Sequence, residues 1–141
     1  MITKFSDEYR WLSNFWLVEI EYEGLIYPSV ENAYQASKTY PEYKHIFATV
    51  NPAKAKILGR TYVTTEYFTN NKLKIMYDLN KIKYSNNDYL KDLLLSTGTQ
   101  ELIEGNTWGD IYWGQCPVGF GQNNLGKILM IIREELKHDQ S

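Results

Sequence analysis

The 141-residue sequence predicts a mainly helical α+β domain with a small antiparallel sheet near its N-terminus. Two patterns predict this fold class. A period-two alternation of apolar and acidic residues lies before residue 24, and apolar stripes with helical spacing fill the second half. Hydrophobic residues make up 43% of the chain and aromatic residues 15%, which is typical of a globular protein. Because a chain of this length builds one core, we expect a single domain over residues 1–141.

The predicted sheet lies near the start of the chain. Residues 2–5 and 16–22 are expected as strands, because apolar residues in the second segment alternate with glutamates. Glu23-Gly24 suits a tight turn, and residues 25–27 would form the returning strand. Together these segments predict a hairpin.

Three short helices are predicted next, over residues 30–40, 42–49 and 52–59. Ser29 suits the N-cap of the first helix, and Pro41 ends it. Asn32 occupies the position where a capping box needs Glu or Gln, so only the simple cap is indicated. The third helix begins at Asn51-Pro52 and ends at Gly59.

Longer helices are expected over residues 66–84, 88–96 and 124–138, with a short extended segment at 100–103. The last helix has the clearest apolar stripe, at positions i, i+3, i+4, i+7 and i+11. This stripe consists of Leu125, Ile128, Leu129, Ile132 and Leu136.

Several protein classes are excluded by what the sequence lacks. No run approaches the roughly 18 apolar residues of a membrane helix, and MITKFSDEYR does not resemble a signal peptide. Cys116 is the single cysteine, and His45 and His138 have no partner at metal-ligand spacing. We therefore expect a cytoplasmic protein without a metal, a cofactor, a membrane partner or an obligate protein partner.

Charge is distributed unevenly along the chain, although the net charge is only −2. Residues 38–91 carry ten Lys/Arg and four Asp/Glu, whereas the first 31 residues carry two basic and six acidic residues. The basic middle would attract a phosphate-bearing ligand or a nucleic acid. The alternative is a solvated helix face, which is the commoner role of scattered lysines.

One candidate for chemistry is the stretch Asn106–Gly126, NTWGDIYWGQCPVGFGQNNLG. Six of the nine glycines lie between Gly105 and Gly126, and Asp110 lies between Trp108 and Trp113. Glycine lets a backbone approach a ligand, and tryptophan offers a flat face to a ring. The stretch is either one wall of a pocket or a turn-rich connection whose tryptophans cap the core.

A second candidate is the helix that follows the hairpin. At 100° per residue, Glu31, Gln35 and Lys38 fall within an arc of about 60° and span about 10 Å. The helix thus offers an acid, an amide and an amine in one row. This row is either catalytic or a solvent-facing polar stripe.

Four segments, in the same order and over nearly the whole chain, resemble the NADAR family, also called YbiA-like. They are SNF at 13–15, SVENAYQASK at 29–38, TGTQELIEGNTWGDIYWG at 97–114 and GQNNLGKILMIIR at 121–133. The resemblance implies a hydrolase that cleaves an N-glycosidic, ribose–nitrogen bond. Its substrate would be ADP-ribosylated guanine or a ribosylaminopyrimidine intermediate of riboflavin synthesis.

The resemblance also implies a set of site residues. Glu31, Lys38 and Asp110 would be catalytic, and the substrate-binding residues would be Ser13, Asn14, Gln35, Trp113, Gly114 and Asn123. The partner would be a ribosyl or ADP-ribosyl group, free or attached to nucleic acid. Substrate choice is expected to depend on residues 115–120.

Chemical reasoning assigns a role to each group. Either acid would stabilise positive charge on C1′ or activate water, and Trp113 would stack on the base. N–H groups near Asn123 would receive a phosphate. Lys38 would either bind phosphate and tune Glu31, or attack C1′ to form an imine-type intermediate.

Two other functions remain open at this point. One is a non-catalytic module that senses ADP-ribose or NAD, which would gain little from two carboxylates beside an anionic ligand. The other is a nucleic-acid-binding protein that uses the basic middle and the aromatic residues.

Overall fold

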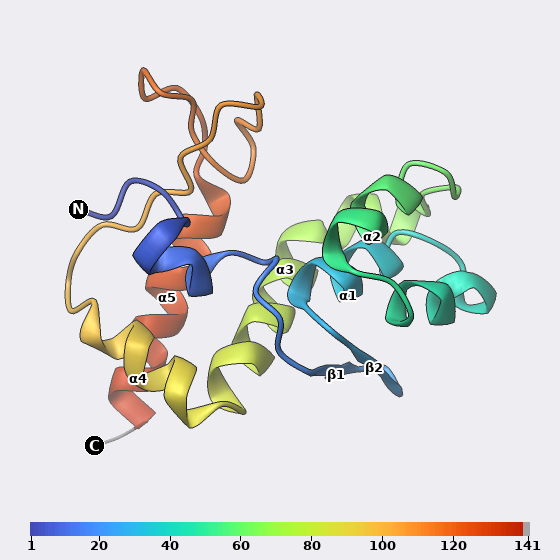
Figure 1. Cartoon of the computed structure of the whole chain (residues 1–141), viewed down its shortest axis with the longest axis horizontal. Helices are drawn as coiled ribbons and strands as arrows, with labels where there is room; N and C mark the ends of the chain where they lie inside the picture. Colours follow the sequence, from blue (N-terminus) through green and yellow to red (C-terminus); the bar gives the residue numbers. More distant parts are fainter. Residues whose placement is uncertain (140–141) are drawn as a thin grey trace. The chain divides into compact units, whose positions relative to one another are not determined.

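The structure is a computed structural model that describes residues 1–139. The predicted domain extends to residue 141, so its last two residues lie outside the described part. Figure 1 shows the elements along the chain, where η marks a 3-10 helix. They are η1 (Asp7–Leu12), β1 (Ile20–Tyr22), β2 (Leu25–Tyr27), α1 (Val30–Ala36), η2 (Pro41–Ala48), α2 (Pro52–Leu58), α3 (Glu66–Ser85), α4 (Asp88–Ser96) and α5 (Asn124–Asp139).

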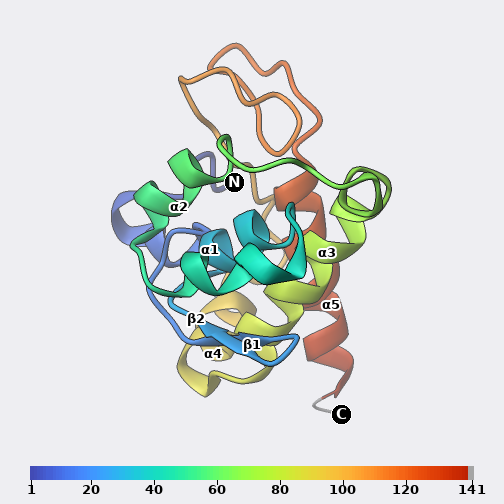
Figure 2. The same cartoon turned by 90° about the vertical axis from the view of Figure 1, so that its right-hand side faces the viewer.

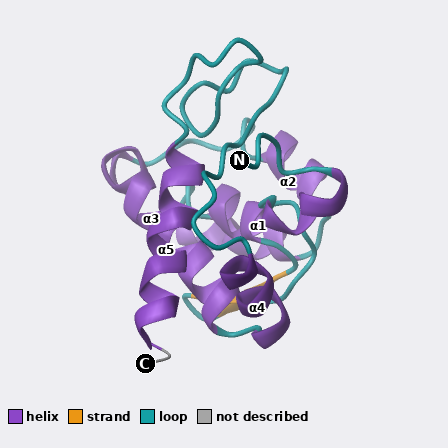
Figure 3. Ribbon diagram, turned by 90° about the vertical axis from the view of Figure 1, so that its left-hand side faces the viewer, coloured by secondary structure: helices purple, strands orange, loops and turns teal. Residues whose placement is uncertain are grey.

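The chain divides into two compact units. The central unit is Asn14–Lys83, and the terminal unit contains residues 1–13 and, among the described residues, 84–139. Mainly helical structure with one small antiparallel sheet is confirmed, and Figure 3 shows how few residues of the described chain are strand.

The hairpin belongs to the central unit and has the predicted turn. Ile20 pairs with Tyr27, and Tyr22 pairs with Leu25. Glu23 and Gly24 both have positive φ, 50° and 85°, which matches the right-handed twist of a two-residue hairpin. Positive φ is unfavourable for glutamate and readily adopted by glycine. Glycine at position 24 therefore lowers the conformational free energy that this turn costs.

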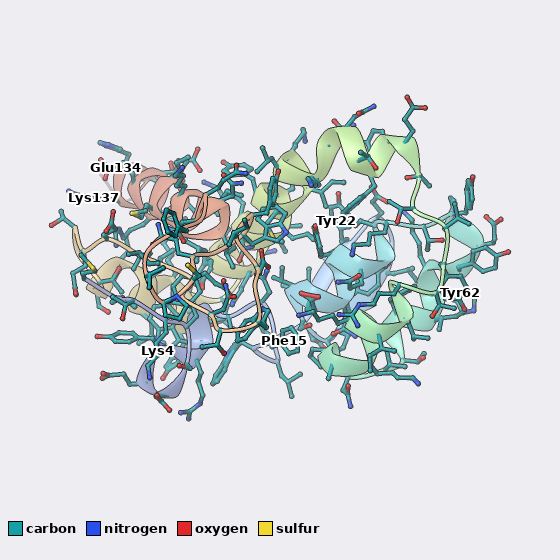
Figure 4. The ribbon with its side chains drawn as sticks, turned by 90° about the horizontal axis from the view of Figure 1, so that it is seen from above. Lys4, Phe15, Tyr22, Tyr62, Glu134 and Lys137 are labelled. Carbon is teal, nitrogen blue, oxygen red and sulfur yellow. The ribbon has the colours of Figure 1, made fainter. Side chains whose placement is uncertain are left out.

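The core of the central unit forms around α1. All seven residues of α1 are buried, and Figure 2 shows α2 and η2 packed around this helix. The Tyr34 and Phe68 rings lie 5.2 Å apart, edge to face, which joins α1 to α3. On the η2 side, Tyr62 stacks on Tyr43 at 5.0 Å and meets Phe47 at 5.9 Å (Tyr62 is labelled in Figure 4).

Asn32 gives α1 a stronger N-terminus than the sequence pattern indicates. Its backbone N–H donates to Ser29 Oγ at 3.1 Å, which is the predicted simple cap. In addition, Ser29 Oγ donates to Asn32 Oδ1 at 2.6 Å, and Asn32 Nδ2 donates to the carbonyls of Phe47 and Val50, each at 2.8 Å. The Asn32 side chain therefore fastens α1 to the chain that leaves η2.

The terminal unit has its core between α4 and α5. Leu90 and Leu94 are buried, as are the five residues of the predicted α5 stripe. Arg133 Nη1 donates to Thr97 Oγ1 at 2.9 Å, so a buried charge on α5 meets the end of α4. Trp11 of η1 and Tyr84 contact edge to face at 6.4 Å.

Four sequence predictions are wrong in detail. The strand expected over residues 16–22 is shortened to Ile20–Tyr22, because its partner β2 ends at Tyr27. Residues 2–5 do not form a strand: Ile2 makes a single parallel bridge to Leu102, because η1 turns the chain away at Asp7. The first predicted helix ends at Ala36 rather than near residue 40. The segment expected as a helix over 42–49 is a 3-10 helix that already begins at Pro41.

Replacing Asn32 with alanine should lower the free energy of unfolding by about 3 kcal/mol, because two buried carbonyls and the Ser29 hydroxyl lose their partner. Urea unfolding followed by circular dichroism measures this loss. Asn51→Ala is the matched control, since the Asn51 side chain only accepts the Lys54 N–H at an exposed helix start. We expect about 1 kcal/mol for the control. Equal losses in the two variants would contradict the role assigned to Asn32.

Candidate active site

Glu31 and Gln35 lie one turn apart on α1 and are both buried, with 7% and 4% of their surfaces exposed. Gln35 Nε2 donates to Glu31 Oε2 at 2.8 Å. The backbone N–H of Glu31 donates to the carbonyl of Asn14 at 3.0 Å, which fixes the start of the helix. This pair is therefore not part of a solvent-facing stripe. A buried carboxylate held by an amide is a group prepared for chemistry.

Lys38 lies in a turn that follows α1, not on the helix as predicted. Its N–H donates to the Gln35 carbonyl at 3.2 Å, and its own carbonyl accepts the Thr65 N–H at 2.8 Å. The Thr39 N–H likewise donates to the carbonyl of Ala36, so the chain after α1 continues as a tighter turn with bonds to the third residue back. Lys38 Nζ lies 5.4 Å from the ring centre of Tyr34 and 5.9 Å from that of Phe68. The ammonium thus lies beside two aromatic faces and is half-buried.

Burial lowers the pKa of Lys38 from its usual value. The nearby Glu31 carboxylate opposes this change, and the cations Arg60, Lys56 and Lys72 add to it. Since the net direction is downward, the neutral amine is easier to form here than on a surface lysine. Arg60, Lys56 and Lys72 thus place positive charge around Lys38 within the central unit.

Asn14 is buried and is held against α3. Asn14 Oδ1 accepts from Asn80 Nδ2 at 3.3 Å, and Asn14 Nδ2 donates to the weak acceptor Met76 Sδ at 3.4 Å. Asn80 was not predicted as a site residue, nor was the fully buried Lys83, whose pKa is lowered to about 7 by burial. Both are polar residues on the otherwise apolar face of a predicted helix. A polar residue at such a position is the sequence signal that could have identified them.

Asp110 organises the glycine-rich loop of the terminal unit, drawn in orange in Figure 1. Its Oδ1 accepts from the backbone N–H groups of Tyr112 at 3.2 Å and Trp113 at 2.9 Å. Asn106 supports it from the other side: its Oδ1 accepts the Asp110 N–H, and its Nδ2 donates to the Asp110 carbonyl. Asn106 was also missed by the sequence prediction.

Gly114 lies where no side chain would fit. A Cβ at this position would overlap the Glu104 carbonyl and carboxylate and lie 2.7 Å from Asn106 Nδ2. Glu104 Oε2 accepts from Asn106 Nδ2 at 2.9 Å, so Glu104 joins the loop network although the sequence did not single it out. The side chains of Glu104 and Asn106 thus pack around the backbone of Gly114 and fix the beginning of this loop.

Asn123 holds the other end of the loop. It has φ of 51°, its Nδ2 donates to the Leu102 carbonyl at 2.9 Å, and its Oδ1 accepts the Glu104 N–H at 2.9 Å. The N–H groups of Asn124 and Leu125 donate to the carbonyls of Tyr112 and Trp113. The donors at the start of α5 that were expected to receive a phosphate are thus bonded within the protein.

The aromatic residues of the loop differ in exposure. Trp113 is half-buried, with its ring edge to face with that of Tyr112 at 4.8 Å. Trp108 is 64% exposed, so it does not cap the core. The exposed Val118 and Phe120 lie in the segment expected to govern substrate choice.

The predicted site residues fall into two groups. The central unit brings together Glu31, Gln35 and Lys38 around α1 and holds Asn14 at the start of that helix. The terminal unit contains Asp110, Trp113, Gly114 and Asn123 in or beside the loop, and the half-buried Ser13 at the end of η1.

The described residues include neither a metal-binding cluster nor a membrane-spanning helix. Within residues 1–139 no three His, Cys, Asp or Glu side chains gather so that they could hold a metal ion. No helix in that range is both long and apolar enough to span a bilayer.

Comparison with known proteins links the chain to one family. The sequence profile of the NADAR domain matches residues 2–137 and so spans both units. The N-glycosidase YbiA of Escherichia coli (strain K12) is 33% identical over 135 residues, which are 93% of this chain and 84% of that protein. The NMR structure of E. coli YbiA superposes with a TM-score of 0.86 at 29% identity, covering 99% of this chain and 89% of that one.

Two longer relatives are riboflavin biosynthesis proteins. The protein VVA0006 of Vibrio vulnificus (strain YJ016) is 32% identical over 136 residues, which are 94% of this chain but only 37% of that protein. The chloroplastic protein PYRR of Zea mays is 33% identical over 125 residues, 78% of this chain and 20% of that protein. The names of these relatives agree with the predicted reaction class, cleavage of an N-glycosidic bond. With the profile matched across both units and the YbiA fold shared, the chain belongs to the NADAR family.

Proposed function

We propose that this chain is an N-glycosidase that hydrolyses a ribose–nitrogen bond with Glu31 and Lys38. The observation that carries the proposal is the pairing of a buried, amide-held carboxylate with a half-buried lysine of lowered pKa, both at α1. A buried acid that lies near a lysine of lowered pKa is typical of active sites. The N-glycosidase names of the relatives support the same class.

Glu31 would act on the charge that develops when the bond breaks. C1′ and the ring oxygen become positive in that transition state. A carboxylate about 4 Å away, at an effective dielectric near 20, contributes about 4 kcal/mol, or roughly two to three decades in rate. Glu31 can also take a proton from the attacking water.

Lys38 would act as the nucleophile. Its neutral Nζ attacks C1′, the C1′–N bond breaks, and its electron pair leaves with the base, which takes up a proton. The lysine-bound ribose then opens as C1′–O4′ breaks: one proton passes from Nζ to O4′, which becomes a hydroxyl, and a protonated imine forms between Nζ and C1′. Water adds to C1′ of the imine and releases the free sugar and the amine. The lowered pKa of Lys38 favours this role over a purely cationic one.

The substrate would carry phosphate. Arg60, Lys56 and Lys72 act on Lys38 electrostatically, so they lie where a phosphorylated ribose would be attracted. The names of the riboflavin biosynthesis relatives support a ribosylaminopyrimidine phosphate, and the family resemblance adds ADP-ribosylated guanine as the second candidate. The cytoplasmic location and the roles of Ser13, Asp110, Trp113, Gly114 and Asn123 stay predictions that accompany this proposal.

A panel of three substrates tests the reaction: ribosylaminopyrimidine phosphate, an oligonucleotide with ADP-ribosylated guanine, and NAD. The wild type should release the sugar from at least one of the first two, measured by chromatography of the products. Glu31→Gln should lower kcat by about a hundredfold to a thousandfold, because it removes the negative charge and keeps the shape.

The same panel separates the alternatives. A module that senses ADP-ribose or NAD would bind a ligand and release no sugar, in the wild type as in Glu31→Gln. A nucleic-acid-binding protein would bind the unmodified oligonucleotide equally well and lose affinity steeply with salt. Either result would overturn the proposed hydrolase.

Borohydride added during turnover should trap Lys38. Reduction of the imine leaves a stable ribosyl adduct, and mass spectrometry of the digested protein should locate it on the peptide that contains Lys38. Lys38→Arg should show no adduct and lose at least a hundredfold in kcat, because arginine keeps the charge but does not form the imine. An active Lys38→Arg without an adduct in the wild type would exclude the nucleophilic role.

The lowered pKa of Lys38 also predicts a pH dependence. Since the neutral amine is the reactive form, kcat/KM should rise with pH through that pKa, below the usual lysine value of 10.5. Arg60→Ala removes a positive charge that lowers the pKa, so this limb should move to higher pH. Lys74→Ala is the control, since Lys74 is bonded to Asp78 on α3 and does not act on Lys38. A limb that stays in place in Arg60→Ala would contradict the assignment to Lys38.

A further inference from the structure

The side-chain amide of Gln35 has two ends with different surroundings. Nε2 donates to Glu31 Oε2 at 2.8 Å. Oε1 is buried and accepts no hydrogen bond from any described residue. The orientation of the amide follows from chemistry, because the reverse arrangement would place its oxygen against the carboxylate oxygen.

Gly59 provides the surface on which Oε1 rests. A Cβ at Gly59 would overlap Gln35 Oε1 and lie 2.8 Å from Gln35 Cδ. The backbone of Gly59 is ordinary right-handed helix, with φ of −59° and ψ of −22°. The usual reason for glycine at a helix end, a left-handed conformation, therefore does not apply. A side chain at this position would therefore displace the amide of Gln35.

These contacts join three residues of two elements, α2 and α1, in a fixed order. The end of α2 presents bare backbone at Gly59, Gln35 rests on it, and the free hydrogen-bond donor of Gln35 reaches Glu31. The donor end of the amide is thus bonded inside the central unit, and its oxygen lies against the backbone of Gly59. A residue that binds substrate needs a polar atom that the ligand can reach, and Gln35 is only 4% exposed.

We infer that Gln35, seated on Gly59, is a positioning residue that orients the Glu31 carboxylate. The family resemblance alone implied substrate binding for Gln35, and this inference assigns it a different task. The kinetic part of the inference rests on the proposed function. Its structural part, that Gly59 and Gln35 act on Glu31, can be tested without turnover.

Kinetics on the substrate that the wild type cleaves test the first part. Gln35→Ala should lower kcat about tenfold to a hundredfold and change KM by less than about twofold, because a misplaced carboxylate weakens only the transition state. Gly59→Ala should give the same loss by displacing the amide. Asn71→Ala, which removes an amide of α3 that bonds the Tyr67 carbonyl, should leave both constants unchanged. A raised KM with unchanged kcat in Gln35→Ala would make Gln35 a substrate ligand and overturn the inference.

The double variant tests whether Gly59 acts through Gln35. Alanine in a helical position usually stabilises relative to glycine, so Gly59→Ala should become harmless once the amide is gone. We expect Gly59→Ala to lower the melting temperature in the wild type and not in Gln35→Ala. The kcat of the double variant should equal that of Gln35→Ala. Additive effects would show that the two residues act independently and would overturn the link.

A titration of Glu31 keeps the inference testable even if the wild type cleaves none of the substrates. The carboxyl carbon of Glu31 can be followed by NMR as pH changes. Loss of the amide donor disfavours the charged form, so the midpoint should move to higher pH in Gln35→Ala and Gly59→Ala. Lys38, the charged neighbour of Glu31, is present in all variants, and Asn71→Ala should leave the midpoint in place. An unmoved midpoint in Gln35→Ala would overturn the inference, whereas an inactive wild type with a moved midpoint would overturn only the proposed function.

Discussion

The buried helix α1 imposes the constraint on which the central unit depends. None of its seven residues is exposed, so its polar side chains must find partners inside the protein. Asn32 does this by donating to one carbonyl near the end of η2 and one just after it, and Ser29 closes the first turn. Because these bonds bind one helix to a segment about eighteen residues further along, the path of the chain around α1 is fixed by hydrogen bonds as well as by apolar packing.

In the terminal unit, asparagine side chains also hold the chain in place, but they do so in a loop rather than around a buried helix. Its glycine-rich loop has little regular structure, and side-chain amides add to the few backbone hydrogen bonds that hold it. Asn106 binds both sides of Asp110, and Asn123 bridges the segment around Leu102 to the start of α5. Asp110 itself bonds two N–H groups of the loop. Its contribution to loop shape is thus a property of the structure, whatever chemistry it adds.

The surroundings of Lys38 in the central unit lower its pKa and so favour loss of its proton. Burial and the cations Arg60, Lys56 and Lys72 lower the pKa of Lys38. The Glu31 carboxylate raises it. Gln35 directs a donor at the same carboxylate and so competes for its charge. The pKa of Lys38 therefore reflects a balance in which burial and the cations outweigh the opposing effect of the Glu31 carboxylate.

Much of this protein was determined by the sequence itself. The hairpin turn at Glu23-Gly24, the caps at Ser29 and Asn51, and the limits of α3, α4 and α5 were predicted correctly, because each depends on residues within a few positions. The family was also apparent, because four separated motifs kept their order. The row of Glu31, Gln35 and Lys38 was found, but its burial was not.

The tertiary structure decided the rest. The first helix stops at Ala36, and the Lys38 carbonyl beyond it bonds the distant Thr65. Residues 2–5 make one bridge because only Ile2 meets Leu102. Gly59 is a glycine because of a side chain 24 positions earlier in the chain. Each of these features depends on a partner far away in sequence. Local patterns therefore found the groups proposed to be catalytic, whereas their burial, charge and orientation follow from contacts that form only in the folded chain.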